Sequence, residues 1–325
     1  MRFRCHWGGT ATYAGASGFV RFVAPILRFI VPSPTTFTIA TMVELPAEFV
    51  ERARQLAAGT LQAPAPRDAA TVVLLRDGAN GLEVYLLRRV SSMAFAAGAT
   101  VFPGVSVDPR DAHLPDDYWS GPPATDWTHA LSADIDLSRG LVCAAVRETF
   151  EESGVLLAGL TERAVVDDTR GEDWEADRLA LIDRSLSFAA FCERRRLVVR
   201  TDLLRPWAQW ITPEIESRRF DTRFFVAALP AGQRTRDVGG EADRVFWLTP
   251  RAALDRAAAG EMALMPPTVA TLGELTAYDG VGQVLAAADD RTINTVAPRV
   301  VVDDPVDGGE PRLRFVLPGD EDYTR

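Results

Sequence analysis

The stretch Arg147-Glu148-Thr149-Phe150-Glu151-Glu152-Ser153-Gly154-Val155 decides how this sequence is interpreted. Glu148, Glu151 and Glu152 stand at positions i, i+3 and i+4, a spacing that places three carboxylates on one face of a helix. Like charges at this spacing destabilise a helix, whereas a divalent cation would turn the repulsion into binding energy. The spacing therefore indicates a metal site built on a helix.

The residues around these carboxylates predict a helix from Gly140 to Ser153. Ser138 can cap its start and Gly154 can end it. Arg147 can reach Glu151 at i+4 and hold one carboxylate in place. A solvated acidic helix face with an Arg–Glu pair has the same local pattern, so the sequence on either side must decide between the two.

Composition restricts the partners that we expect. The chain has 325 residues, of which 47% are hydrophobic and 25% charged, enough for one large domain with insertions or two small ones. Its formal net charge is −10 and it has no basic stripe, so we expect no nucleic-acid partner. All 35 basic residues are arginines, as codon bias in a GC-rich genome would produce. Arginine, backbone N–H groups or a metal must therefore meet any phosphate.

Cysteine and histidine usage restricts the metal. The three cysteines and three histidines are scattered along the chain and form neither a CxxC pair nor a disulfide framework. This suits a reducing compartment and makes a zinc site improbable. Any bound metal should be a hard cation held by carboxylates, Mg²⁺ or Mn²⁺.

Residues 1–43 differ from the rest because they contain four arginines and no acidic residue. The apolar run 18–32 is too short and too charged to span a bilayer, so we expect no membrane partner. Three interpretations compete: an organelle transit peptide, a poor secretory signal, or a leader outside the working protein with Met42 as the true start. We favour the leader and expect a cytoplasmic protein, with an organelle matrix as the alternative.

Hydrophobic patterning divides the rest of the chain. Strand-like runs at 71–75 and 82–87 flank a good hairpin turn. Residues 108–136 have no clear period and predict an inserted loop, whereas 173–196 is helical and highly charged. We expect four parts: the 1–43 extension, a helix and linker at 44–68, a domain at 69–290 with insertions at about 112–137 and 160–200, and a C-terminal hairpin and tail at 291–325. Mixed strands and helices indicate an α/β (α+β) sandwich.

Here the sequence resembles a known family. Residues 147–155 match the second half of the Nudix box, R-E-(apolar)-x-E-E-x-G-(apolar), and Phe102-Pro103-Gly104 resembles the F-P-G-G entry to its first half. The whole box is G-x5-E-x7-R-E, and this chain departs from it three times. Val105 replaces the box glycine and Asp111 its glutamate, and residues 112–146 fill the gap before the arginine.

The resemblance implies a Nudix α/β/α sandwich with a mixed sheet and helical insertions. Carried over position by position, it implies that Glu148, Glu151 and Glu152 are metal ligands and that Arg147 orients one of them. Asp111, shorter by one carbon than the family's glutamate, would be an outer ligand. The metal ions would bridge a diphosphate and activate a water for in-line attack.

The general base has two candidates, a glutamate of the box or a later one. Glu241 is our later candidate, because it lies just before a predicted strand at 244–248. An exposed turn glutamate after Gly239-Gly240 would look the same.

A long insertion inside the box is a feature of the Nudix branch that contains a peroxisomal or mitochondrial coenzyme A diphosphatase, and in this respect the chain resembles that branch. The stretches 207–213 and 218–225 extend that resemblance. It implies hydrolysis of coenzyme A or acyl-CoA to 3′,5′-ADP and (acyl-)4′-phosphopantetheine. Two alternatives stay open: a pyrophosphatase for nucleotide sugars, dinucleotides or modified nucleotides, and a non-catalytic Nudix-fold regulator, which the lost box glycine would suit.

Substrate contacts follow from a second motif. Coenzyme A-cleaving members often carry L-L-T-x-R-S-x3-R-x3-G-x3-F-P-G-G, of which this chain keeps Arg89, Gly98 and the F-P-G spacing. Arg89 and Gly104 are therefore candidates for binding the small-molecule diphosphate. Arg218 and Arg219, outside this motif, are further candidates because arginine can bind phosphate oxygens by bidentate contacts. Each arginine could equally solvate a strand. The two insertions could form a lid and substrate wall or the contact of a homodimer.

Overall fold

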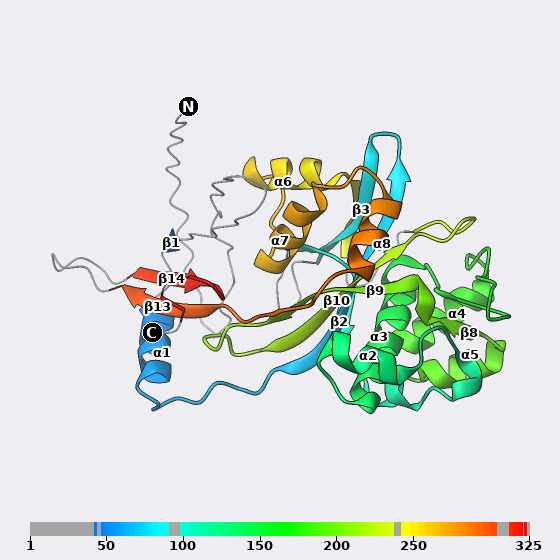
Figure 1. Cartoon of the computed structure of the whole chain (residues 1–325), viewed down its shortest axis with the longest axis horizontal. Coiled ribbons are helices and arrows are strands. Elements are labelled where there is room, and N and C mark those ends of the chain that lie inside the picture. The colour runs from blue at the N-terminus through cyan, green and yellow to red at the C-terminus, as the bar shows by residue number, and fades with distance from the viewer. Residues whose placement is uncertain are drawn as a thin grey trace, which may run out of the picture.

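A mixed β-sheet forms the centre of the fold, with helices on both of its faces (Figure 1). The computed structural model describes residues 42–43, 47–90, 98–236, 242–303, 312–320 and 322–323. Across the sheet the strands follow one another in the order β11 (Ala242–Leu248), β3 (Gly81–Arg89), β2 (Arg67–Gly78), β10 (Phe220–Ala228), β9 (Leu204–Ile211) and β12 (Thr295–Val296). Two short strands lie off this path: β4 (Thr100–Val101) pairs with β3, and β5 (Gly104–Ser106) pairs with β2.

Strand direction in the sheet is mixed. β2 and β3 form the predicted antiparallel hairpin. β11 is also antiparallel to β3, and β9 is antiparallel to β10. β10 instead runs parallel to β2, and β12 parallel to β9. Side chains of β2 alternate between the two faces, and both sets are buried, as expected for a strand covered on both sides.

Helices cover the two faces of the sheet separately. One face packs on α2 (Ala124–Leu131), α3 (Ile135–Ser153), α4 (Glu172–Ile182) and α5 (Phe188–Arg195). The other face packs on α6 (Pro250–Ala258), α7 (Pro266–Leu275) and α8 (Val281–Asp289). The predicted α/β/α sandwich with a mixed sheet is confirmed.

The two inserted segments pack against each other. β6 (Trp119–Ser120) of the first pairs in parallel with β8 (Val198–Arg200) of the second, and β8 also pairs with β7 (Ala158–Gly159). Three short 3-10 helices complete this region: η1 (Pro109–His113), η2 (Asp116–Tyr118) and η3 (Thr201–Leu203). The insertions therefore form one lobe beside α3.

Our expectation of a structureless loop at 108–136 was wrong. This segment contains η1, η2 and α2, and α2 buries Trp127 and Leu131 in the core. These two side chains lie at i and i+4 on one helix face, and their packing stabilises the helix. The polar residues around them obscure the helical periodicity of hydrophobic residues in the sequence.

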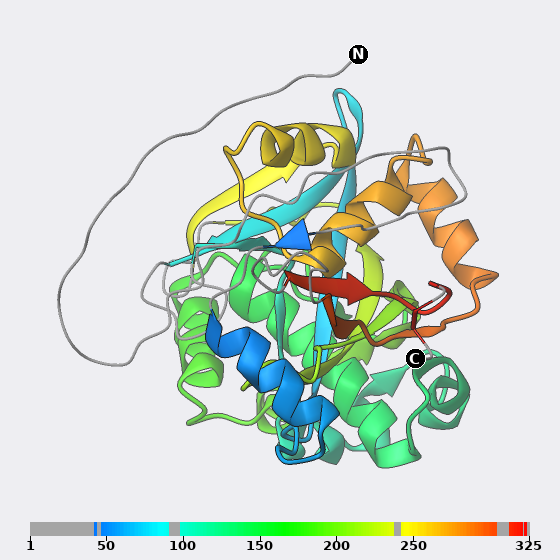
Figure 2. The same cartoon turned by 90° about the vertical axis from the view of Figure 1, so that its left-hand side faces the viewer.

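A small separate sheet lies at the chain ends. β1 (Met42–Val43) pairs with β14 (Arg312–Val316), which pairs with β13 (Arg299–Asp303). Figure 2 shows α1 (Ala47–Ala57) beside this sheet, where Val50 and Ala53 pack on Leu313 and on Ile215 of the β9–β10 turn.

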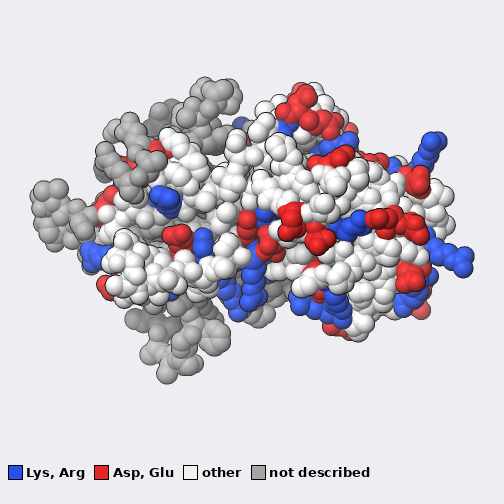
Figure 3. All heavy atoms as spheres, turned by 60° about the horizontal axis from the view of Figure 1, so that its bottom comes forward, with Lys and Arg blue, Asp and Glu red and all other residues white. Residues whose placement is uncertain are grey.

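Residues 1–41 lie outside the described part of the chain, so our interpretations of the N-terminal segment stay predictions. None of the described helices is long and apolar enough to cross a membrane. On the face seen in Figure 3, basic side chains are interspersed with acidic ones.

Candidate active site

Helix α3 carries the acidic residues, and it is longer than predicted. It starts at Ile135, because the Asp134 carboxylate accepts the Leu137 N–H at 2.8 Å. The predicted cap, Ser138, is wrong: it is fully buried within the helix. At the other end Gly154 has a φ of +73° and donates its N–H to the Phe150 carbonyl at 2.9 Å, so the predicted helix end is confirmed.

Two of the three glutamates on the acidic face of α3 are buried, and Glu152 is half-buried. Glu148 is 4% exposed and Glu151 is 7% exposed, which excludes the interpretation of a solvated acidic face. Arg147 lies between them: its Nη1 is 2.9 Å from Glu151 Oε1 and 3.5 Å from Glu148 Oε2. The predicted i, i+4 pair of Arg147 and Glu151 is therefore present, within a buried cluster.

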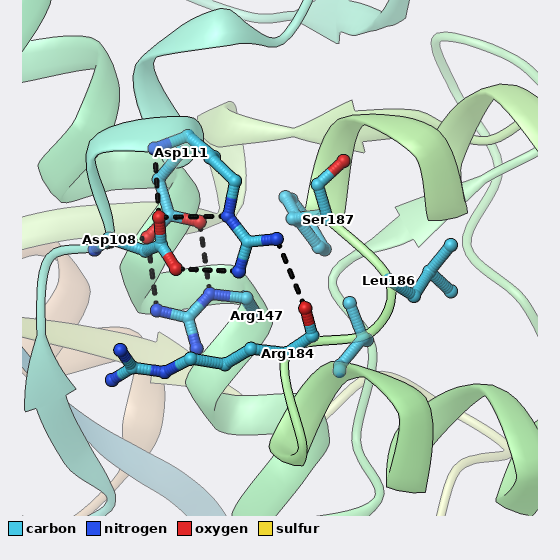
Figure 4. Close-up of a pocket in the computed structure, with 9 residues that line it drawn as sticks. Asp108, Asp111, Arg147, Arg184, Leu186 and Ser187 are labelled. Carbon is cyan, nitrogen blue, oxygen red and sulfur yellow. Dashed lines mark hydrogen bonds and ion pairs between the residues drawn. The ribbon is translucent and has the colours of Figure 1, made fainter.

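Asp111 completes the surroundings of Arg147. Its two carboxylate oxygens accept hydrogen bonds from Arg147 Nε and Nη2, both at 3.0 Å, and one of them also accepts the Asp108 N–H at 3.0 Å (Figure 4). Asp111 also forms the capping box of η1 with the N-cap Asp108, and its side chain faces the guanidinium. That Asp111 is in addition an outer metal ligand stays a prediction. Asp111 holds Arg147 in place.

Glu152 is held from the opposite side by the Phe102-Pro103-Gly104 loop. The Gly104 N–H donates to Glu152 Oε2 at 3.0 Å. A Cβ on Gly104 would lie 2.3 Å from Thr71 Oγ1 and 3.2 Å from the Ala70 carbonyl oxygen, so any other residue here would force Thr71 of β2 to move. This bond joins the two halves of the predicted motif. That Gly104 also contacts substrate stays a prediction.

Burial and charge act against each other in this cluster. Burial raises the pKa of the Glu151 carboxyl above its usual range, and the Arg147 guanidinium opposes that rise. Burial also disfavours the charge on Arg147, but the hydrogen bond to Asp111 and the negative charges of Asp111, Glu151 and Glu148 together outweigh it and raise the pKa of the guanidinium. One guanidinium thus faces more carboxylates than it can neutralise.

The cluster fits a hard divalent cation by its chemistry. Glu148, Glu151 and Glu152 supply carboxylate oxygens, the donors that Mg²⁺ and Mn²⁺ prefer, and a cation would offset their excess negative charge. Within the described ranges, no three ligand-type side chains yet converge on one point, since Glu152 is turned to Gly104 and Glu151 to Arg147.

Arg89 lies at the end of β3, and its predicted contact with substrate stays a prediction. The main-chain N–H of Arg89 donates to the Ala99 carbonyl at 2.9 Å, and its main-chain carbonyl accepts the Gly98 N–H at 3.1 Å. Two residues of the second motif are therefore in contact. Ala242 pairs with it from β11. Glu241, which precedes Ala242 in the sequence, lies outside the described residues, so its role as general base stays a prediction.

The other candidate arginines are placed differently. Arg219 donates to the main-chain carbonyls of Thr212 and Pro64, at 3.0 and 2.9 Å, and so ties the β9–β10 turn to the linker. Arg218 is exposed in that turn. Among the described residues, neither guanidinium contacts the glutamates of α3. The assignment of both arginines to substrate binding stays a prediction.

Two contacts at the end of α3 were missed from the sequence. Arg178 of α4 donates to the Glu151 carbonyl at 2.7 Å, and the Tyr85 hydroxyl of β3 donates to the Glu152 carbonyl at 3.3 Å. Neither residue stands at a spacing from the acidic helix that would have revealed it, because both contacts arise from tertiary packing.

Comparisons with known proteins agree with this fold. A family model described as the NUDT19 Nudix domain matches residues 122–275. A solved NUDIX hydrolase from Alicyclobacillus acidocaldarius is 32% identical, superposes with a TM-score of 0.60, and covers 68% of this chain and 96% of its own. The mixed sandwich is thus shared with a hydrolase.

The chain belongs to the Nudix hydrolase family, and it is a diphosphate hydrolase of that family. The alternative of a non-catalytic regulator is not supported. Acyl-coenzyme A diphosphatase NUDT19 of Xenopus laevis is 25% identical over 288 residues, which cover 74% of this chain and 71% of that protein. Putative nudix hydrolase 7 of Caenorhabditis elegans is 28% identical over 210 residues, or 65% of this chain and 60% of that protein.

Proposed function

We propose that this protein hydrolyses the diphosphate bond of coenzyme A or acyl-CoA, with Mg²⁺ or Mn²⁺ as cofactor. Water is added across the bond, and the products are 3′,5′-ADP and (acyl-)4′-phosphopantetheine. The observation that carries the reaction type is the buried carboxylate cluster of α3, in which Glu148 and Glu151 face a single guanidinium. The substrate is supported by the likeness to the acyl-coenzyme A diphosphatase NUDT19 proteins of Xenopus laevis and Gallus gallus.

The chain's own residues would perform distinct tasks. Glu148, Glu151 and Glu152 would hold the cation, which when bound neutralises charge on the diphosphate and lowers the pKa of an attacking water. Arg147 restrains Glu151, and the Gly104 N–H orients Glu152. A glutamate would accept the proton of the attacking water, either one of these three or Glu241.

Substrate binding falls to arginine in this proposal, because the chain contains no lysine. Arg89 is our candidate for a phosphate of the substrate, since it lies against Gly98 and beside β4, next to the loop that holds Glu152. A cytoplasmic location and a homodimer complete the proposal as predictions.

The test is product analysis after incubation with coenzyme A, acetyl-CoA, a nucleotide sugar, a dinucleotide and an oxidised nucleotide, with and without Mg²⁺. We expect metal-dependent release of 3′,5′-ADP with 4′-phosphopantetheine, and little turnover of the other substrates. Preferred cleavage of another compound would refute the substrate.

A variant tests the site itself. Glu152→Gln keeps the shape of the side chain but removes its charge, so we expect turnover to fall by at least about 100-fold. Glu193→Gln, on the exposed surface of α5, is the matched control and should keep full activity. If Glu152→Gln retained most activity, the metal-site assignment would be wrong.

A further inference from the structure

The C-terminal turn of α3 is electrostatically unfavourable. The last carbonyls of a helix have no partner within the helix and carry its partial negative charge. In this turn Glu151 and Glu152 add their carboxylates to that negative end. Something outside the helix must hold this turn if its side chains are to keep one geometry.

The second insertion supplies a buried cation at this position. Arg178 of α4 is 1% exposed, and its Nη1 donates to the Glu151 carbonyl at 2.7 Å. Its Nε and Nη2 bind the two oxygens of Glu175 at 3.0 and 2.6 Å. The guanidinium is therefore fixed by a bidentate pair on one side while it contacts the catalytic helix on the other.

A second arginine continues this network around the helix end. Arg236 Nη2 lies 3.0 Å from Glu175 Oε2, and its main-chain N–H donates to the Ser153 carbonyl at 3.1 Å. Arg236 also donates to the Thr169 carbonyl at 3.0 Å, and the Thr169 hydroxyl donates to the Gly154 carbonyl. Consecutive carbonyls of the turn are thus bound from outside.

Aromatic packing fastens the inserted segment to the same helix. Phe150 of α3 stacks on Phe191 of α5 at a centroid distance of 5.5 Å and meets Trp174 of α4 edge-on at 6.3 Å. Trp174 and Phe191 contact each other as well, at 6.2 Å. The helices that carry and flank Arg178 are therefore in fixed contact with α3.

From these contacts we propose that Arg178 is a positioning residue for the metal site, acting through the main chain of Glu151. This rests on the proposed metal-dependent hydrolysis. Arg178 orients the turn that presents Glu151 and Glu152, and Glu175 orients Arg178. The second insertion then supplies a positioning residue to the catalytic helix, and neither a lid nor a dimer contact is needed to explain it.

Metal affinity separates positioning from a merely structural role. Full-length protein is titrated with Mn²⁺, and free Mn²⁺ is followed by electron paramagnetic resonance. Arg178→Met should raise the Mn²⁺ dissociation constant by about 10-fold and lower kcat, with the KM for coenzyme A changed by less than about twofold. Arg178→Lys should recover part of the loss, because an ammonium can reach the carbonyl or Glu175 but lacks the planar fork.

The control is Arg194→Met, which removes an exposed guanidinium of the same insertion while its buried partner Asp177 keeps a second ion pair with Arg195. It should leave metal affinity and kcat unchanged. If Arg178→Met fails to fold, Glu175→Gln decides, because it loosens Arg178 without removing it and should raise the dissociation constant by about threefold.

Each outcome has one meaning. A folded Arg178→Met protein with wild-type Mn²⁺ affinity and kcat would overturn the inference. If Arg178→Met does not fold, a Glu175→Gln protein with wild-type Mn²⁺ affinity would overturn it. Full turnover by Glu152→Gln would instead overturn the proposed metal site.

Discussion

Replacing Arg147 by methionine is expected to destabilise the protein strongly. The guanidinium lies 3.0 Å from Asp111 and 2.9 Å from Glu151, and the exposures of the three side chains are 10%, 2% and 9%. Methionine keeps most of the aliphatic volume, so the main loss is charge. Breaking a buried ion pair by removing one partner costs about 3–5 kcal/mol, because the remaining charge is left without compensation. We expect a loss in this range.

The assay is urea unfolding at pH 7 with EDTA present, so that no divalent cation stabilises the variant. Arg194→Met is the control: its guanidinium is 53% exposed and Asp177 keeps Arg195 as a partner, so the loss should be about 0–1 kcal/mol. Adding Asp111→Asn to Arg147→Met should return about 1–3 kcal/mol of the loss, since it removes one of the uncompensated carboxylates. Equal, small losses in Arg147→Met and Arg194→Met would refute the reasoning.

Two further predictions concern the ends of the same site. Gly154→Ala forces a Cβ into a φ of +73° and within 2.6 Å of Arg236 Nε, so it should lose more stability than Gly59→Ala, where φ is +70° and nothing lies within 4 Å. The strain alone costs about 1–2 kcal/mol, and an equal loss in both by thermal unfolding would contradict the clash. The hydrogen bond from Arg110 lowers the pKa of Asp108 to about 2, so this carboxylate stabilises the fold above pH 4 and its contribution disappears as the pH falls towards 2. Asp108→Asn should therefore be less stable than wild type at pH 6, with a difference that narrows below pH 4; a constant difference in urea unfolding would count against this.

Local patterns carried the sequence-based predictions that succeeded. The i, i+3, i+4 spacing of the glutamates and the stop at Gly154 depend only on residues within one helix, so both were visible in the sequence. The β2–β3 hairpin followed from its turn residues in the same way.

Contacts between distant segments could not be predicted. Asp111 meets Arg147 across 36 positions and Arg178 meets the Glu151 carbonyl across 27, and no periodicity links such pairs. The cap at Asp134 was missed for another reason: Ser138 also suits a helix start by its residue type, and only packing shows that it is buried within the helix and that the helix starts four residues earlier.

The bond between Asp111 and Arg147 also bears on how the chain tolerates an interrupted motif. Closing a loop of 36 residues, where the uninterrupted pattern closes about eight, adds about 1.3 kcal/mol of entropy cost by the logarithmic dependence on loop length. Burial of Trp127 alone, at 5% exposure, offsets that amount, because burying a large apolar side chain contributes about 1.5–3 kcal/mol. An insertion at this point therefore costs little once it folds its own helix against the core, so the separation of the two motif halves along the chain is thermodynamically inexpensive.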